Sequence, residues 1–189
     1  MSTFDKSAIE QALSLLGSLM VARKRPSHHL VICGGSALIA LQLVPRTTKD
    51  IDVLATVRDG YLRCARPFPD WLREDAEAVQ AELKLPREWL NDGPADEDLF
   101  RLGLPQGVEK RLVSIIFGPL LTASFISRYD QIHLKLYAAA DQGGRHFEDL
   151  KKLFPTEKEL RAAMDWVFTQ DDSPAFHQLV GEVLDALGQ

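Results

Sequence analysis

Apolar residues recur along the chain with two different periods, which predict where its helices and strands lie. Residues 4–24 carry apolar side chains at steps of three and four, the spacing that puts them on one face of a helix. Residues 30–33 form a short apolar, β-branched run, and residues 49–55 alternate polar and apolar side chains. Two further apolar runs cover residues 111–117 and 121–126. These four segments predict strands.

The remaining segments predict short helices, a long loop and a helical C-terminal part. Ser36 is expected to cap a short helix over 37–43, and 71–85 reads as a helix, whereas 86–105 is rich in Pro, Gly and Asp and predicts a loop. Thr156 and Glu159 have the spacing of a capping box. After residue 127 the pattern is helical throughout, over 128–141, 146–154, 156–169 and 174–187.

The fold class that follows is α/β (α+β), organised in two parts. We expect a small mixed sheet flanked by helices in a domain of residues 1–126. A helical bundle is expected to form a C-terminal domain of residues 127–189.

Composition and charge narrow the possible partners. The chain has 46% hydrophobic and 26% charged residues and a formal net charge of −5, which argues against broad, charge-driven binding to nucleic acid. The basic cluster Arg23, Lys24 and Arg25 is interpreted as the solvated last turn of the first helix. Two cysteines, Cys33 and Cys64, provide neither a disulfide framework nor a zinc-binding spacing.

Localisation is predicted from what the sequence lacks. The first residues have neither the charged nor the apolar region of a signal peptide, and the mostly apolar stretch 31–44 is too short to cross a bilayer. We therefore expect a cytoplasmic protein with no membrane partner.

The segment with the clearest chemistry is Gly34-Gly35-Ser36, followed after thirteen residues by Asp50-Ile51-Asp52. Two glycines between a strand and a helix allow the backbone to approach a ligand closely, and the following amides favour an anion such as phosphate. Aspartates at alternate strand positions project from one face, and two such carboxylates favour a bound Mg²⁺ or Mn²⁺. This combination is typical of metal-assisted phosphoryl or nucleotidyl transfer.

The alternative is a strand-to-helix turn followed by a hairpin strand with two surface aspartates. A Gly-Gly turn is common in α/β proteins, but Asp is rare within strands because it packs poorly there. The two elements in this order favour the functional interpretation.

The pattern of strand, Gly34-Gly35-Ser36, short helix and Asp50-x-Asp52 resembles the signature of the nucleotidyltransferase-fold (DNA polymerase β-like) superfamily, in particular bacterial AbiEii-type proteins. The run from Arg46 through Lys49 to Asp52 is similar to their basic-Thr-x-Asp-x-Asp motif. A second stretch, from Lys135 to Arg145, His146 and Asp149, resembles their helical lysine and basic–acidic motif.

The resemblance implies a metal-dependent nucleotidyltransferase that moves a nucleotidyl group from an NTP to a hydroxyl of a protein, RNA or small molecule. It also implies a possible role as the toxin of a toxin–antitoxin pair with a cognate antitoxin. Asp50 and Asp52 would hold Mg²⁺, and Gly34, Gly35 and Ser36 would contact the nucleotide phosphates. Lys135, with Arg46 or Lys49, would neutralise the charge that develops in the transition state.

Lys135, His146 and Asp149 each have a second interpretation. Lys135 shares a helix face with Ile132 and Leu136, so its alkyl stem is able to line the core while its ammonium reaches water, instead of a triphosphate. His146 and Asp149, three residues apart, either lie together near Lys135 or belong to an ordinary first turn of a helix.

Active members of the superfamily usually carry a third carboxylate on a later strand. The corresponding strand is expected at 111–117, where only Ser114 is available. Substitutes are Glu109, Asp149 or an acid of the preceding loop, which contains Asp92, Asp96, Glu97 and Asp98. A chain without this third acid would instead be a non-catalytic nucleotide-binding or regulatory protein on the same fold. A purely interacting module is the remaining alternative and leaves both aspartates unexplained.

Overall fold

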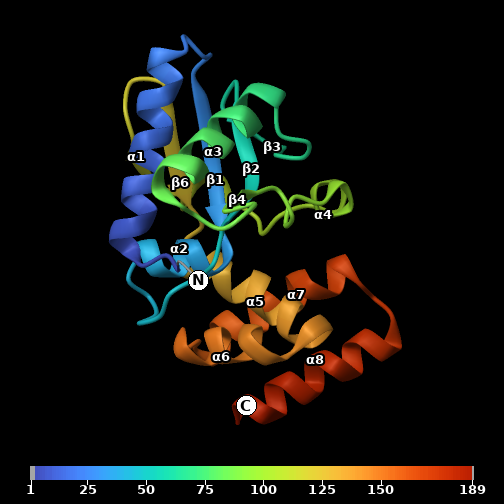
Figure 1. Cartoon of the computed structure of the whole chain (residues 1–189). Coiled ribbons are helices and arrows are strands. Elements are labelled where there is room, and N and C mark those ends of the chain that lie inside the picture. The colour runs from blue at the N-terminus through green and yellow to red at the C-terminus, as the bar shows by residue number, and fades with distance from the viewer. Residues whose placement is uncertain (1–2, 189) are drawn as a thin grey trace.

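The computed structural model describes residues 3–188, so the first two residues of the N-terminal segment and the last residue of the helical part lie outside it. Within this range the mixed α/β class is confirmed, with eight α-helices and one six-stranded mixed sheet. Figure 1 shows the sheet with α1, α2 and α3 against it in the N-terminal part, and α5 to α8 gathered beyond one end of the sheet.

The sheet contains parallel and antiparallel neighbours in the order β3-β2-β1-β6-β5, with β4 pairing β2. Its strands are β1 His28–Cys33, β2 Ile51–Arg58, β3 Tyr61–Cys64, β4 Leu90–Asn91, β5 Val113–Ile116 and β6 Leu121–Phe125. β1 runs parallel to β6 and antiparallel to β2, whereas β4 runs parallel to β2. The ends of β1 and β6 and the beginnings of β2 and β4 therefore meet at one edge of the sheet.

Three helices of the N-terminal part pack on one face of this sheet: α1 Lys6–Ala22, α2 Gly34–Ala40 and α3 Asp70–Leu83. The short α4 Glu97–Leu102 and the 3-10 turn η1 Val108–Lys110 pack against the other face. Ile9, Leu13, Leu16 and Met20, the predicted stripe of the first helix, are fully buried. They join Ile32 and the other inward residues of β1, β2 and β6 in the main core.

The second face of the sheet has a smaller core, and a β-bulge contributes to it. Val31 pairs with Ala55 but Ile32 pairs with Val53, so Leu54 is left out of the pairing. Leu54 and Ala55 consequently both pack with Val31 in this smaller core. The bulge ends the simple alternation that the sequence shows over 49–55.

The four predicted C-terminal helices are confirmed: α5 Arg128–Gln142, α6 Gly144–Lys152, α7 Glu157–Gln170 and α8 Pro174–Leu187. Thr156 and Glu159 form the predicted capping box at the start of α7. Apolar residues of these helices, such as Leu136 and Val180, belong to the same core as those of α1.

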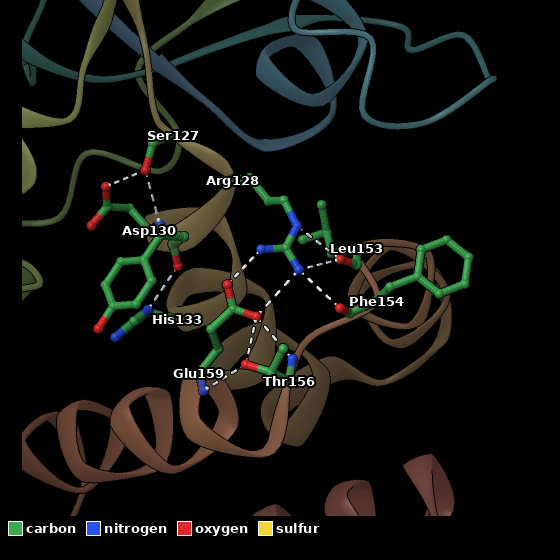
Figure 2. A network of polar contacts seen from close by, with 9 residues as sticks. Ser127, Arg128, Asp130, His133, Leu153, Phe154, Thr156 and Glu159 are labelled. Atoms are coloured by element: carbon green, nitrogen blue, oxygen red, sulfur yellow. Dashed lines mark hydrogen bonds and ion pairs between the residues drawn. The ribbon is translucent and has the colours of Figure 1, made fainter.

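Arg128 ties three of these helices together, as Figure 2 shows. At the start of α5, its guanidinium donates to the carbonyls of Leu153 and Phe154 at the end of α6, and to the carboxylate of Glu159 in α7. Carbonyls at a helix C-terminus have no hydrogen-bond donor within the helix, and here the guanidinium acts as that donor. Arg128 thereby fixes the orientation of α6, whose residues His146 and Asp149 face the candidate site.

The prediction about the basic cluster at the end of α1 is correct in part. Arg23 and Lys24 are exposed there, but Arg23 and the half-buried Arg25 both donate to the carboxylate of Asp75 on α3, which is completely buried. A buried carboxylate needs cationic partners, and the residues at the C-terminal end of α1 provide them. Cys33 is a buried free cysteine.

Candidate functional site

The turn between β1 and α2 brings the backbone against Asp52. Gly34 has φ +63°, and a Cβ at this position would lie 2.7 Å from the Asp52 Oδ2 atom. Both the left-handed conformation and the close approach therefore require glycine. The chain enters α2 directly at Gly34, after Cys33.

The predicted capping role of Ser36 is wrong, because α2 begins at Gly34, three residues earlier than expected, and ends at Ala40. Ser36 lies within the first turn and is fully buried. Its hydroxyl donates to the carbonyl of Cys33 and accepts from the backbone amide of Asp52, at 3.1 and 3.3 Å. Ser36 thus connects the turn to β2, and it does not line the cavity described below.

Asp50 and Asp52 stand at the beginning of β2. Asp52 is the second residue of the strand, and Asp50 is the residue just before the strand begins. The Asp50 carboxylate accepts a hydrogen bond from the Thr48 hydroxyl at 3.1 Å. Burial and the nearby charge of Asp50 raise the pKa of Asp52. A cation beside the two carboxylates would favour the charged form of both.

Two cations are fixed opposite these acids by Asp149, which is 1% exposed. Arg46 donates to Asp149 through Nε and Nη2 at 2.9 and 2.8 Å, and the Lys135 Nζ atom lies 3.0 Å from Oδ2. Burial alone would raise the pKa of Asp149, but the hydrogen bonds from Arg46 and the charge of Lys135 bring it below its usual value. Asp149 is therefore negatively charged and forms ion pairs with both Arg46 and Lys135.

Lys135 does not extend to the solvent, so that interpretation of its helix face is wrong. The residue is 5% exposed, and its ammonium ends between Asp149 and His146, whose Nδ1 atom lies 3.4 Å away. Burial, and then the charge of Lys135, lower the pKa of His146, which keeps the imidazole neutral. The expected proximity of Lys135, His146 and Asp149 is confirmed.

These groups face a cavity of about 1020 Å³ between the sheet edge and the C-terminal helices. The predicted residues that line it are Gly34, Gly35, Arg46, Asp50, Asp52, Lys135 and His146. Asp149 lies behind the two cations it holds, and Lys49 is exposed outside the cavity. Side chains of α4 and its N-cap, of α5 and of α7 also line the cavity, and they are both apolar and charged: Leu99, Leu102, Leu134, Tyr137 and Trp166, with Asp96, Asp98 and Arg101.

Other lining residues were given no role by the sequence. Arg145, which lies next to His146, adds a further cationic side chain, and Asn91 and Gln131, which belong to no motif, add carboxamides. The Gln131 Nε2 atom donates to the carbonyl of Gly34 at 3.4 Å. Only Arg145 belonged to a segment that the sequence singled out, and polar residues without a motif are found only from tertiary contacts.

The expected position of a third carboxylate is wrong. β5 lies at the opposite end of the sheet from β2, and its Ser114 meets the Ser124 hydroxyl at 2.7 Å instead of Asp52. The strand beside β2 at this edge is β4, where Asn91 is the register partner of Asp52.

The acids of the loop have other structural roles. Asp92 accepts from the Phe68 amide, Asp96 caps α4, and Asp98 pairs with Arg101. Asp96 and Asp98 nevertheless line the cavity, as the sequence allowed. Glu97 and Glu109 do not line the cavity. Within residues 3–188, no three His, Cys, Asp or Glu side chains converge as a metal site would require.

Asp50 and Asp52 provide only two carboxylates, but both open onto the cavity and are the oxygen ligands that a divalent cation would use there, with its remaining ligands coming from a bound molecule or water. The described part of the chain has no helix with the length and apolar character needed to cross a membrane.

Comparisons with family models, with curated proteins and with solved structures find no match to this chain.

Proposed function

We propose that this protein is a metal-dependent nucleotidyltransferase of the nucleotidyltransferase-fold type, transferring a nucleotidyl group from an NTP to a hydroxyl acceptor. The observation that carries the proposal is that one cavity is lined by both negative and positive side chains. Asp50 and Asp52 form one wall, while Arg46, Lys135 and Arg145 provide positive charge in the same space. A triphosphate with its divalent cation has the complementary distribution of charge.

The cationic side chains would bind the phosphates. Arg46 and Lys135 share one carboxylate, Asp149, so the three groups retain a net positive charge directed at the cavity. Because Asp149 is buried and holds both through short hydrogen bonds, the cations are oriented before a ligand arrives. Their positions need little reorganisation as charge develops on the transferred group.

Asp50 and Asp52 would hold Mg²⁺ or Mn²⁺. Such an ion supplies charge neutralisation and Lewis acidity at phosphoryl oxygens. In the reaction, the acceptor oxygen forms a bond to the α-phosphorus, the bond from that phosphorus to the bridging oxygen breaks, and pyrophosphate leaves. The hydroxyl proton passes to solvent, and the positive charge of Lys135 and Arg46 stabilises the departing phosphates.

The cavity also has apolar and aromatic lining residues, among them Tyr137 and Trp166, which would contact a nucleoside or part of the acceptor. The acceptor that we propose follows from the family resemblance alone: it is RNA, protein or a small molecule. A cognate antitoxin is a candidate partner on the same ground. The alternative is a nucleotide-binding protein without catalysis, and it is favoured by the lack of a third converging carboxylate within residues 3–188.

The test uses each of the four NTPs labelled at the α-phosphate, Mg²⁺, and RNA or lysate protein as acceptor. We expect label to appear in an acceptor with wild type, and to fall roughly ten- to a thousandfold with Lys135→Met, which keeps the stem and removes the charge. Lys49→Met is the matched control, because Lys49 lies outside the cavity and its loss should leave transfer unchanged.

Two results would count against the proposal. Equal transfer by wild type and Lys135→Met would remove Lys135 from the reaction. No transfer from any NTP, together with nucleotide binding in the cavity, would establish the non-catalytic alternative.

A further inference from the structure

Asn91 occupies a specific position beside the proposed ion site. β4 has only two residues and runs parallel to β2, with Ile51 opposite Leu90 and Asp52 opposite Asn91. Neighbouring strands lie about 4.8 Å apart, so paired residues on the same face bring their side chains into contact. The Asn91 Nδ2 atom lies 3.2 Å from the Asp52 Oδ1 atom.

The orientation of the Asn91 carboxamide is determined by a second contact. The backbone amide of Gly93 donates to Asn91 Oδ1 at 3.0 Å, so this atom must be the oxygen. The NH₂ group therefore faces Asp52 and donates to it. A carboxylate oxygen that accepts this hydrogen bond is held in place, and the partial positive charge of the N–H repels a cation on that side.

The other acids near the cavity already have partners. Both oxygens of Asp149 are taken by Arg46 and Lys135. Asp96 and Asp98 line the cavity, but Asp96 caps α4 and Asp98 pairs with Arg101. The carboxylates left beside Asn91 are thus Asp50 and Asp52, enough for one divalent ion but not for two.

We propose that Asn91 is a positioning residue that holds Asp52 for a single divalent ion and, because its side chain presents an N–H donor instead of a carboxylate oxygen, prevents a second ion from binding. The inference deepens the proposed function and rests on it. It predicts that the number of bound ions is set by one side-chain atom, the Asn91 nitrogen, rather than by the size of the cavity.

The experiment counts Mn²⁺ ions on the full chain by electron paramagnetic resonance, without nucleotide and without an activity assay. Wild type should bind one ion. Asn91→Asp should bind two, and ions about 3.5–4 Å apart should give a spin-coupled spectrum. Asn91→Ala should still bind one ion, with affinity about tenfold or more weaker, because Asp52 loses the bond that orients it.

Gln142→Glu is the matched control. It makes the same carboxamide-to-carboxylate change in the same cavity but on α5, away from Asp52, so the count should stay at one. Two ions on wild type, one ion on a folded Asn91→Asp protein, or unchanged affinity in Asn91→Ala would each overturn the role of Asn91. No Mn²⁺ on wild type would instead overturn the metal site of the proposed function, and the inference with it.

Discussion

Arg46 and Asp149 are 103 residues apart in the chain and bind through two parallel hydrogen bonds, from Nε to Oδ1 at 2.9 Å and from Nη2 to Oδ2 at 2.8 Å. This bidentate pair ties the segment before β2 to α6, and Lys135 of α5 joins it at the same carboxylate. One buried contact therefore connects the sheet edge, where Asp50 and Asp52 lie, to the helices that supply the cations. The geometry of the site depends on it.

Asp149→Asn should lower the free energy of unfolding by about 3 kcal/mol, because two cations lose their buried anionic partner. Added inorganic triphosphate should raise the melting temperature more in this variant than in wild type, since it replaces the lost negative charge. Glu157→Gln is the control: its pair with Arg161 is exposed and should contribute less than about 1 kcal/mol. Denaturant titration measures both, and equal losses would contradict a special role for Asp149.

The double variant Asp50→Asn/Asp52→Asn should lose most binding of Mn²⁺ in the presence of nucleotide, because neutral amides cannot replace both charged oxygen ligands. Isothermal titration measures the affinity. Asp98→Asn, which removes a carboxylate of the same cavity that already pairs with Arg101, should bind nearly as wild type. Unchanged Mn²⁺ affinity in a folded double variant would refute the assignment.

Gly35→Val should weaken nucleotide binding while the fold survives. A Cβ at Gly35 would lie 2.7 Å from the Arg46 Nη2 atom, the end of a long side chain, so the guanidinium has to shift from its place beside Asp149 while the backbone stays. Loss of one charge-assisted phosphate contact costs about 1.5–3 kcal/mol, a reduction of roughly ten- to a hundredfold in affinity. Gly181→Ala adds a methyl group where no atom lies within 4 Å and should leave affinity unchanged. Normal binding by Gly35→Val would place the phosphates elsewhere.

The network around Arg128 (Figure 2) should make stability depend on acid pH. Hydrogen bonds from Arg128 lower the pKa of Glu159 from 4.5 to about 2. The carboxylate is charged in the folded state at a pH where the unfolded chain already binds a proton. Its contribution is complete above about pH 4.5 and is lost as the pH falls from 4.5 towards 2.

Arg128→Met should remove this dependence and lower the free energy of unfolding at pH 7 by about 2 kcal/mol. Thermal denaturation of both proteins between pH 2 and 7 provides the measurement. Parallel pH profiles for variant and wild type would show that another group is responsible.

Much of the secondary structure follows from local pattern, because periodic burial and capping are properties of neighbouring residues. The stripe of α1, the capping box at Thr156 and the four C-terminal helices needed no long-range information. The predicted strands are also present, although β2 begins at Ile51 instead of 49 and continues to Arg58. Ser36 was misassigned because the left-handed Gly34 starts α2 earlier than any side-chain cap would indicate.

Strand order and side-chain partners depended on the tertiary structure. The sequence by itself indicated that Gly34, Gly35, Asp50 and Asp52 lie close together, since a short helix between two strands leaves the end of the first near the beginning of the second. It could not determine that β4 lies beside β2, because a two-residue strand has no period and its pairing is decided by the packing of the loop around it. Nor could it decide whether Lys135 reaches water or Asp149, since both outcomes satisfy the same helix face. Only the docking of α6 against α5 makes the buried carboxylate the nearest partner of that ammonium.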